Sequence, residues 1–324
     1  MITRPALLTP EFRALSARLG QDPLQVQGPG GNTSIKDGEV MWIKASGTEL
    51  ANAERDDIFV PVDRQAAIAE ARGAAGDGSC KGTVLDPGIR LRPSIETTFH
   101  AALDFPVVVH THSVAAIVHG ICPQGRAAAE AALSGLAYAL VPYCKPGLPL
   151  TGQILARARA ETCVFLLENH GLICCGASVA EVGALVAEVE RRLALPPADI
   201  GRVSPSEDPP EGFEWAAAGW LATDARALSL ATVGTYYPDH VVFLGPRLPT
   251  QNHAGRPPAV LHPGTGTAIR ADATTSQRAM LKCLSDVLAR LPDGWEPEPI
   301  GEAAEAELLD WDAEKYRQAL AART

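Results

Sequence analysis

Two histidines one residue apart follow a run of three valines in the segment PVVVHTHS, residues 106–113. β-Branched valines favour a strand, and Pro106 marks its entry. Side chains alternate along a strand, so we expect His110 and His112 to project from one face while Thr111 points to the other. Two buried imidazoles need polar partners, because an unpaired polar group in an apolar setting costs free energy. The pair therefore either makes ordinary hydrogen bonds or helps to hold a metal ion.

A third histidine lies at the bend of a predicted hairpin, CVFLLENHGLICCG (163–176), whose first strand is as apolar as the strand of the histidine pair. If the two strands belong to one sheet, His170 can complete a three-imidazole site with His110 and His112. Three neutral imidazoles around zinc leave an open coordination position, which suits a Lewis acid acting on a carbonyl or hydroxyl oxygen. The alternative is that Asn169 and Gly171 simply form a turn.

A carboxylate stands near the start of a predicted helix in PSIETTFHAAL (93–103), with Ser94 as its N-cap. Glu96 would lie in the first turn, where a negative charge interacts favourably with the helix dipole. His100, one turn later, would share its face. Glu96 is thus either an ordinary N-terminal acid or a base beside a metal, with its proton affinity set by the ion and by burial.

Two glycine-containing loops, GPGGNTS (28–34) and KASGT (44–48), flank a predicted hairpin that turns at Asp37 and Gly38. Antiparallel pairing brings the two loops to the same end of the sheet. Backbone N–H groups together with Asn32, Ser46 and Lys44 would form a concave site for an anion. The spacing fits neither a P-loop nor a dinucleotide-binding fingerprint, and a turn-forming role remains an alternative.

The chain divides best at residues 195–212, a segment rich in proline and acidic residues. This predicts a catalytic domain over 1–195 and a smaller C-terminal α/β unit over 213–324, packed on the first domain or continuous with it. The patterns also predict a helix around 126–140, a strand in HVVFLG (240–245) and a final helix over LLDWDAEKYRQAL (308–320).

Composition limits the class of function. The chain of 324 residues is 46% hydrophobic and 20% charged, with a net charge of −10, which argues against general nucleic-acid binding. No apolar run approaches the roughly 20 residues that cross a bilayer, so we expect no membrane partner. The seven cysteines have neither disulfide-framework nor CxxC spacing, which favours reduced thiols and a cytoplasmic location.

Taken in order, GGNTS, KASGT, SIETTFHAAL, HTHS and ENHGL resemble the motifs of the class II, zinc-dependent aldolase/adducin family. That family includes fuculose-phosphate and rhamnulose-phosphate aldolases and ribulose-phosphate 4-epimerase. The resemblance covers roughly residues 8–195. Later segments, YYPDHVVFLGPRLP and PPAVLHPGTG, are similar to the aldolase half of bifunctional rhamnulose-phosphate aldolase/dehydrogenases. The fold implied is α/β: three α/β/α layers around a central, mostly antiparallel sheet, plus the smaller C-terminal extension.

The resemblance implies roles for individual residues. It makes Glu96 the catalytic acid/base, and Lys44 would add charge to the substrate's phosphate from its strand end. Zn²⁺, or another divalent transition metal, would be the cofactor, and the family commonly forms homotetramers. The remaining matches are His110, His112 and His170 for the metal, and Asn32, Ser46, Gly47 and Ser94 for the phosphate.

Two departures from the family pattern bear on function. Many of these aldolases have a second serine just before the glutamate, where this chain has Ile95, so one phosphate contact is missing. The family's tyrosine proton donor comes from a neighbouring subunit, and several tyrosines are candidates for it: Tyr138, Tyr143, Tyr236 and Tyr237.

The resemblance leaves several activities open. Glutamate at position 96 favours an aldolase over the epimerases, which usually carry aspartate there. We therefore expect retro-aldol cleavage of a sugar phosphate, such as a ketose 1-phosphate, to dihydroxyacetone phosphate and an aldehyde. Decarboxylases of phosphorylated keto-acids share most of these motifs. Adducin-like binding modules keep the fold but lose the histidines, so they fit this chain least.

Overall fold

The computed structural model describes residues 3–201, 203–250 and 256–322. The outer ends of the two expected units, residues 1 and 324, and position 202 of the predicted linker lie outside the described residues. How the chain divides into independently folding domains therefore stays a prediction.

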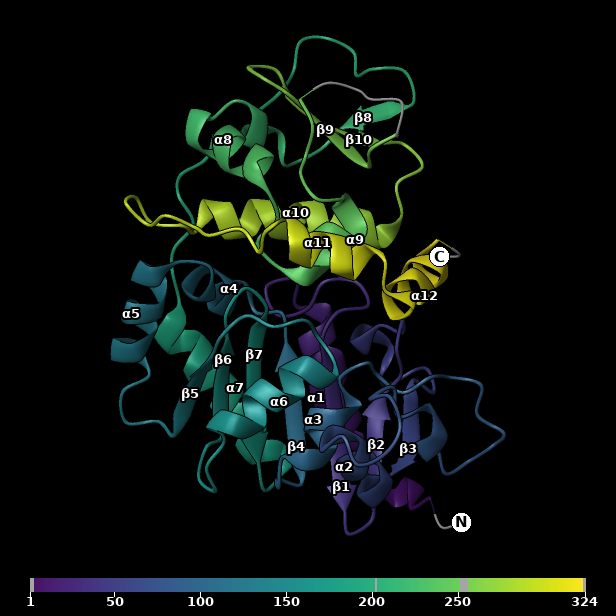
Figure 1. The fold of residues 1–324 in the computed structure, drawn as a ribbon. Helices are drawn as coiled ribbons and strands as arrows, with labels where there is room; N and C mark the ends of the chain where they lie inside the picture. The colour runs from purple at the N-terminus through teal and green to yellow at the C-terminus, as the bar shows by residue number, and fades with distance from the viewer. Residues whose placement is uncertain (1–2, 202, 251–255, 323–324) are drawn as a thin grey trace.

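A seven-stranded sheet forms the lower part of the molecule in Figure 1. All neighbouring strands are antiparallel except β5 and β6, which run parallel. The fold class expected from the sequence is confirmed. The order across the sheet is β3 (Phe59–Asp63), β2 (Val40–Lys44), β1 (Asn32–Asp37), β4 (Val107–Thr111), β7 (Gly171–Gly176), β6 (Val164–Leu167) and β5 (Tyr138–Val141).

Helices cover both faces of this sheet, because its strands are apolar on both sides. Val107 and Val109 of β4 pack in one buried cluster with helices on one face, whereas Val108 packs in another cluster on the opposite face. The first face is covered by α1 (Pro10–Gln21), α5 (Pro123–Ala132) and α7 (Val179–Leu193), and the second by α2 (Arg64–Ala71), α3 (Thr97–Ala102) and α6 (Leu148–Arg157).

A second, three-stranded antiparallel sheet lies in the upper part of Figure 1, in the order β8 (Phe213–Trp215), β10 (Gly266–Arg270), β9 (Ala259–His262). A large buried cluster joins the residues of this upper part to α4 (Val114–Gly120), the helix that directly follows β4 and the histidine pair. The remaining helices are α8 (Ala225–Val233), α9 (Pro238–Leu244), α10 (Thr275–Ala289), α11 (Glu302–Leu309) and α12 (Asp312–Ala321).

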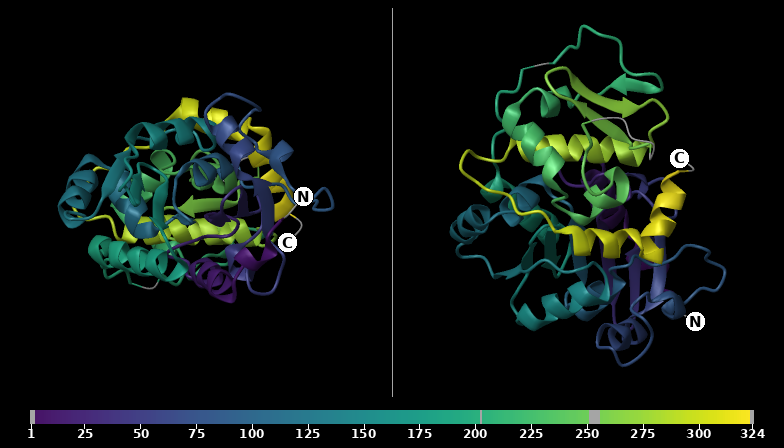
Figure 2. Two further views of the ribbon diagram at one scale, coloured as in Figure 1. Left: turned by 90° about the horizontal axis from the view of Figure 1, so that it is seen from below. Right: turned by 45° about the horizontal axis from the view of Figure 1, so that its top comes forward.

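The C-terminal helix returns to the first sheet. In Figure 1, α12 lies above the upper ends of β2 and β3, and the right-hand view of Figure 2 shows the same C-terminal helix at the edge of the molecule. Its Leu320 lies so close to Gly47 that a Cβ added there would be 2.3 Å from the leucine Cδ1. The end of the chain thus lies over the loop that leaves the first hairpin.

Four local expectations were wrong. The segment HVVFLG is part of helix α9, which has Pro238 at its first position and an acid in its first turn. The helix expected over 126–140 ends at Ala132, before Gly135 turns with a φ of 83°, and Tyr138 begins β5. The last helix is broken by extended backbone at Trp311. Finally, α3 begins at Thr97, so Glu96 takes the N-cap position in place of Ser94.

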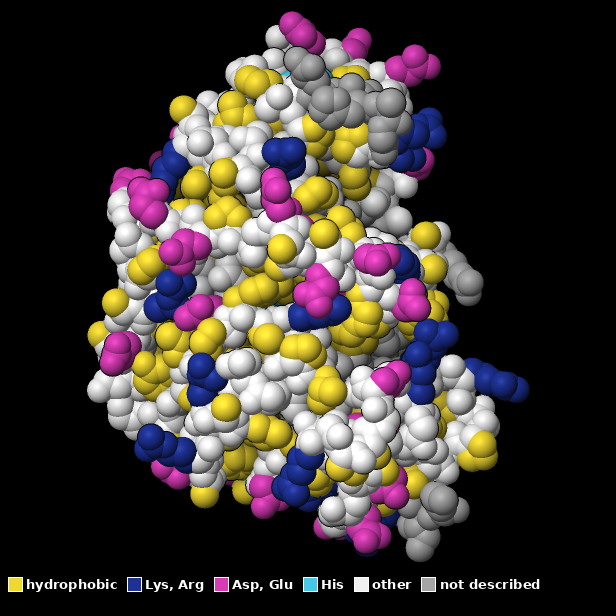
Figure 3. All heavy atoms as spheres, in the orientation of Figure 1, with side chains coloured by type: hydrophobic (Ala, Val, Ile, Leu, Met, Phe, Trp, Pro, Cys, Tyr) yellow, Lys and Arg dark blue, Asp and Glu magenta, His cyan; other side chains and the backbone are white. Residues whose placement is uncertain are grey.

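The surface carries both signs of charge. On the face drawn in Figure 3, acidic and basic side chains alternate without forming an area of a single sign. Among the described residues, no helix combines the length and the apolar character that a membrane span requires.

Candidate metal centre and active site

The three histidines meet at the upper end of the first sheet. His110 lies on β4, His112 one residue beyond the end of that strand, and His170 in the turn between β6 and β7. Because β4 and β7 are neighbours, with Thr111 opposite Leu172, the two histidine segments come together. The ring centroids are 4.9–5.2 Å apart, and one nitrogen of each ring lies within 4.8 Å of the others.

The turn that carries His170 has specific backbone requirements. Asn169 adopts a φ of 52°, a left-handed conformation that asparagine tolerates better than most residues. Its side chain donates hydrogen bonds to the carbonyls of Tyr236 and Glu298, which ties the turn to the upper part of the molecule. At Gly171 a Cβ would lie 2.3 Å from the Thr111 carbonyl oxygen, so only glycine fits against β4. This geometry is compatible with both interpretations of NHG: the segment forms a turn, and that turn also brings His170 to the other two histidines.

The chemistry of the three rings fits a metal ion. His110 Nδ1 lies 3.0 Å from the Leu172 carbonyl oxygen, so it carries the proton, and its buried Nε2 has no partner among the described residues. His170 Nδ1 is also buried and unpartnered. Burial lowers the pKa of His110, and it lowers the pKa of His170 to about 3, so both rings are neutral at pH 7. Neutral imidazole is the form that binds a divalent metal.

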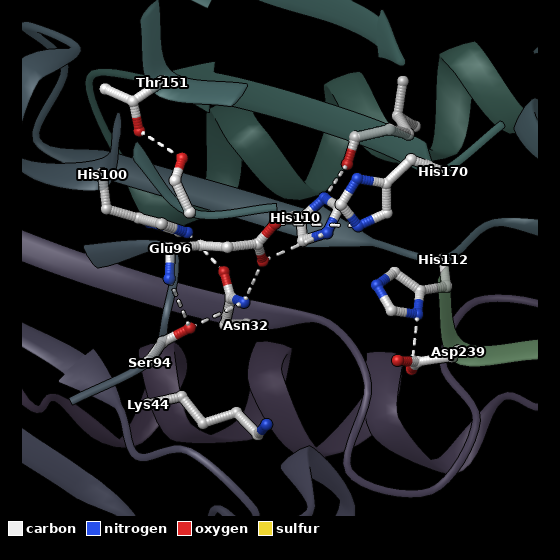
Figure 4. Close-up of polar contacts among 12 residues, drawn as sticks. Asn32, Lys44, Ser94, Glu96, His100, His110, His112, Thr151, His170 and Asp239 are labelled. Carbon is white, nitrogen blue, oxygen red and sulfur yellow. Dashed lines mark hydrogen bonds and ion pairs between the residues drawn. The ribbon is translucent and has the colours of Figure 1, made fainter. Parts of the chain in front are cut away.

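Glu96 faces the same centre (Figure 4). Its Oε2 lies 3.4 Å from His110 Nε2 and its Oε1 lies 3.6 Å from His170 Nε2. Burial alone would raise the pKa of Glu96, but the neighbouring histidines and the Asn32 amide outweigh it and lower the pKa to about 2. The carboxylate is therefore ionised, and its buried Oε1 has no hydrogen-bond partner among the described residues. A base with a free oxygen points at the position where the imidazoles converge.

A chain of hydrogen bonds holds Glu96 in place. Asn32, which lies opposite His110 in the sheet, donates from Nδ2 to Glu96 Oε2 at 2.8 Å and to Ser94 Oγ at 3.2 Å. The side-chain oxygen Oδ1 of Asn32 contacts His100 Nε2, and His100 Nδ1 contacts Ser34 Oγ at 2.8 Å. Ser94 Oγ also accepts from the Glu96 backbone N–H. Asn32 and Ser94 line the small cavity at this site, and their role at a phosphate stays a prediction.

The other predicted phosphate-site residues surround the same space. Lys44 donates from Nζ to the Pro29 carbonyl at 2.8 Å, and burial, with the nearby Arg317, lowers its pKa to about 7. Ser46 and Gly47 line a cavity of about 30 Å³ together with Glu96, His112 and His170. That volume holds roughly one water molecule.

A larger cavity of about 610 Å³ lies next to the small one and shares with it Ser46, Ile95 and Pro146. Its far wall comes from the C-terminal segment. Arg92 stacks on the Tyr316 ring at 3.9 Å, and Lys145 on the Trp311 ring at 4.8 Å. The four tyrosines considered as proton donors are not among the residues that line these two cavities.

Three ionisable residues of the small cavity were missed by sequence reasoning: Asp239, Glu314 and Arg317. Asp239 accepts a bidentate pair of bonds from Arg317 and contacts His112 Nδ1 at 3.2 Å. Although burial favours the neutral acid, Arg317 and His112 lower the pKa of Asp239. Burial raises the pKa of Glu314 despite its contact with Arg317. In the sequence, these residues are only an arginine and two acids within apolar or amphipathic segments. Surface helices commonly have the same composition, so the pattern does not mark a site.

Comparison with known proteins gives one family match and several relatives. The family model described as "Class II Aldolase and Adducin N-terminal domain" matches residues 12–195. An uncharacterised oxidoreductase of Bacillus subtilis, YuxG, is 32% identical over 179 residues, which cover 49% of this chain and 25% of that protein. The 3-oxo-tetronate 4-phosphate decarboxylase of Escherichia coli K12 is 33% identical over 117 residues, covering 32% of this chain and 55% of that enzyme. The matches thus span about a quarter and about half of these relatives' lengths.

Among solved structures, the N-terminal class II aldolase domain of a conserved protein from Thermoplasma acidophilum superposes with a TM-score of 0.51 at 24% identity. The alignment covers 60% of this chain and 97% of that one. This likeness shows a shared fold for the first sheet and its helices.

Proposed function

The chain belongs to the class II aldolase and adducin family, and from this premise we propose that it is a metal-dependent lyase that cleaves a phosphorylated ketose by a retro-aldol reaction. The products would be dihydroxyacetone phosphate and an aldehyde. The observation that carries the proposal is the carboxylate of Glu96, 3.4 and 3.6 Å from two of three converging imidazoles.

Each residue has a distinct task in this mechanism. His110, His112 and His170 would hold Zn²⁺ or another divalent transition metal, and such an ion supplies electrostatic stabilisation where an oxyanion develops. When the carbon–carbon bond breaks, its electron pair is left next to the carbonyl as an enediolate. Glu96 would exchange a proton with the carbon of that enediolate, and Asn32 holds the carboxylate at the required angle.

The small cavity has no room for a sugar chain, so the reacting carbons would lie at its mouth and the rest of the substrate in the larger cavity beside it. Ser46 lines both, and we propose that its hydroxyl and the Gly47 backbone contact the phosphate. Lys44, at the end of β2, would contribute positive charge near the phosphate. From the family resemblance we also propose a homotetramer, in which a neighbouring subunit supplies the tyrosine proton donor.

Replacing Ser46 with alanine should weaken use of a phosphorylated substrate by about 10- to 100-fold in kcat/KM. A hydrogen bond to a charged group contributes roughly 1.5–3 kcal/mol, and this substitution removes one. The measurement is kcat/KM for a phosphorylated substrate and for its dephosphorylated analogue, in both proteins. An equal loss on both compounds would place the phosphate elsewhere, and a wild type that prefers the free sugar would remove the phosphate from the proposal.

A second candidate is decarboxylation of a phosphorylated 3-oxo acid, which the curated decarboxylase relative favours. Loss of carbon dioxide from such an acid leaves the same kind of enediolate or enolate, so the same residues would serve. A panel of ketose 1-phosphates, keto-acid phosphates and pentulose 5-phosphates, assayed with added zinc, separates the reactions. Dihydroxyacetone phosphate identifies the aldolase and carbon dioxide the decarboxylase, whereas an isomer with neither fragment identifies an epimerase.

A further inference from the structure

His112 differs from the other two histidines in what orients its ring. His110 lies within β4 and is fixed by a backbone carbonyl of the neighbouring strand. His112 lies beyond the last residue of β4, so the ladder of that strand no longer holds it. Its Nδ1 instead contacts a side chain, Asp239 Oδ2, at 3.2 Å (Figure 4).

Asp239 is itself held from a second element. Arg317 of α12 donates to both of its carboxylate oxygens, at 2.8 Å and 3.1 Å. Asp239 is 1% exposed and Arg317 7% exposed, so the pair is shielded from water. Arg317 Nη1 also donates to Glu314 at 2.8 Å, so one guanidinium nitrogen serves both carboxylates. The geometry is that of a carboxylate clamped at both oxygens, with one of them also facing an imidazole N–H.

We propose that Asp239, clamped by Arg317, is a positioning residue that fixes the ring of His112 with Nε2 toward the metal. The inference rests on the metal site of the proposed function, but not on which reaction occurs there. A carboxylate on the distal nitrogen of a ligating histidine sets its tautomer and raises its basicity. Both residues lie outside the matched residues 12–195, so the C-terminal part of the chain would complete the metal centre.

The loop before β1 offers an independent way to disturb the same contact. A Cβ added to Gly30 would lie 2.7 Å from His112 Nδ1 and 3.0 Å from Asp239 Oδ2. Gly30→Ala therefore inserts a methyl group between the two side chains without changing any charge. Gly82 is a matched control, because a Cβ there meets nothing within 4 Å.

The test is zinc affinity of the full-length chain, measured by competition with a chromophoric chelator. Asp239→Asn keeps the shape of the side chain but loses its charge, and we expect zinc to bind about 10- to 100-fold more weakly. Gly30→Ala should shift affinity in the same direction, while Gly82→Ala should leave it unchanged. Glu305→Gln, which removes the charge of a buried carboxylate bonded to Thr235 and not to Arg317 or His112, should change zinc affinity less than threefold.

A double-mutant cycle separates positioning from general damage. Gly30→Ala and Asp239→Asn disturb the same contact and keep all three imidazoles, so the double variant should bind zinc no more weakly than Asp239→Asn alone. An unchanged affinity in both Asp239→Asn and Gly30→Ala overturns the proposal, as do effects of the two substitutions that add in full in the double variant. If Asp239→Asn does not fold, Gly30→Ala against Gly82→Ala decides alone. A wild type that binds no zinc would overturn the metal site itself, and with it this inference.

Discussion

Glu96→Gln should lower kcat by about 10² to 10⁴ while zinc stays bound, because the amide keeps the shape of the side chain but cannot exchange a proton. In the structure, Asn32 donates to Glu96 Oε2, and Oε1 is left free toward the imidazoles. The substitution removes proton transfer and leaves the three histidines in place. Turnover and elemental zinc content, measured on the same preparation, check both parts of the expectation.

Proton exchange gives this prediction a readout that does not depend on cleavage. If Glu96 exchanges the proton at the enediolate carbon, the wild type should wash deuterium from solvent into dihydroxyacetone phosphate, and Glu96→Gln should not. Glu305→Gln is the matched control, since Glu305 is a buried carboxylate bonded to Thr235, away from the histidines. Near-wild-type turnover in Glu96→Gln would mean that another group is the base.

The sequence predicted those parts of the fold whose patterns are local. A hydroxyl directly before an apolar helical stripe is a local signal of this kind, and in the structure Thr9 caps α1 and Ser178 caps α7. The valines of β4 alternate between the two faces of the sheet, which places His110 beside Phe99 on the α3 side. The periodicity of apolar residues and the capping of helices are properties of short segments. They can therefore be recognised without knowing against which elements a segment packs.

One segment buried on every side and one edge strand were assigned the wrong secondary structure. All seven residues of α9 are buried, so its apolar run lacks the polar face that distinguishes a helix from an inner strand. Pro238 at its first position was the remaining signal. β5 was assigned to a helix because its identity comes from parallel pairing with β6, a non-local contact.

The candidate site divides in the same way. The family resemblance named His110, His112, His170 and Glu96, and the structure brings these four together. It did not indicate that Asn32 bonds to Glu96, because an asparagine in a loop motif gives no sign of its partner. Asp239 and Arg317 reach the site only through the packing of the C-terminal helices on the first sheet, which no pattern within either segment records.

His110→Ala should abolish metal binding and activity together. His110 is fully buried, and its ring is fixed by the Leu172 carbonyl, so the substitution removes one of three prearranged ligands and leaves a void in its place. His119→Ala is the matched control. His119 is another buried histidine, its Nδ1 bonds to the Ala115 carbonyl, and it does not belong to the group of three candidate ligands. Elemental analysis after dialysis should find zinc in the wild type and in the control but almost none in His110→Ala.

Thermal unfolding extends the test to the protein without substrate. A ligand that binds only the folded state stabilises it by an amount that grows with its free concentration, so added zinc should raise the Tm of the wild type and of His119→Ala. The Tm of His110→Ala should not respond, because two imidazoles without the third bind the ion too weakly. Full zinc occupancy in His110→Ala, or an equal rise in its Tm, would remove His110 from the ligand set and leave the ionised Glu96 without the cation that its proposed role requires.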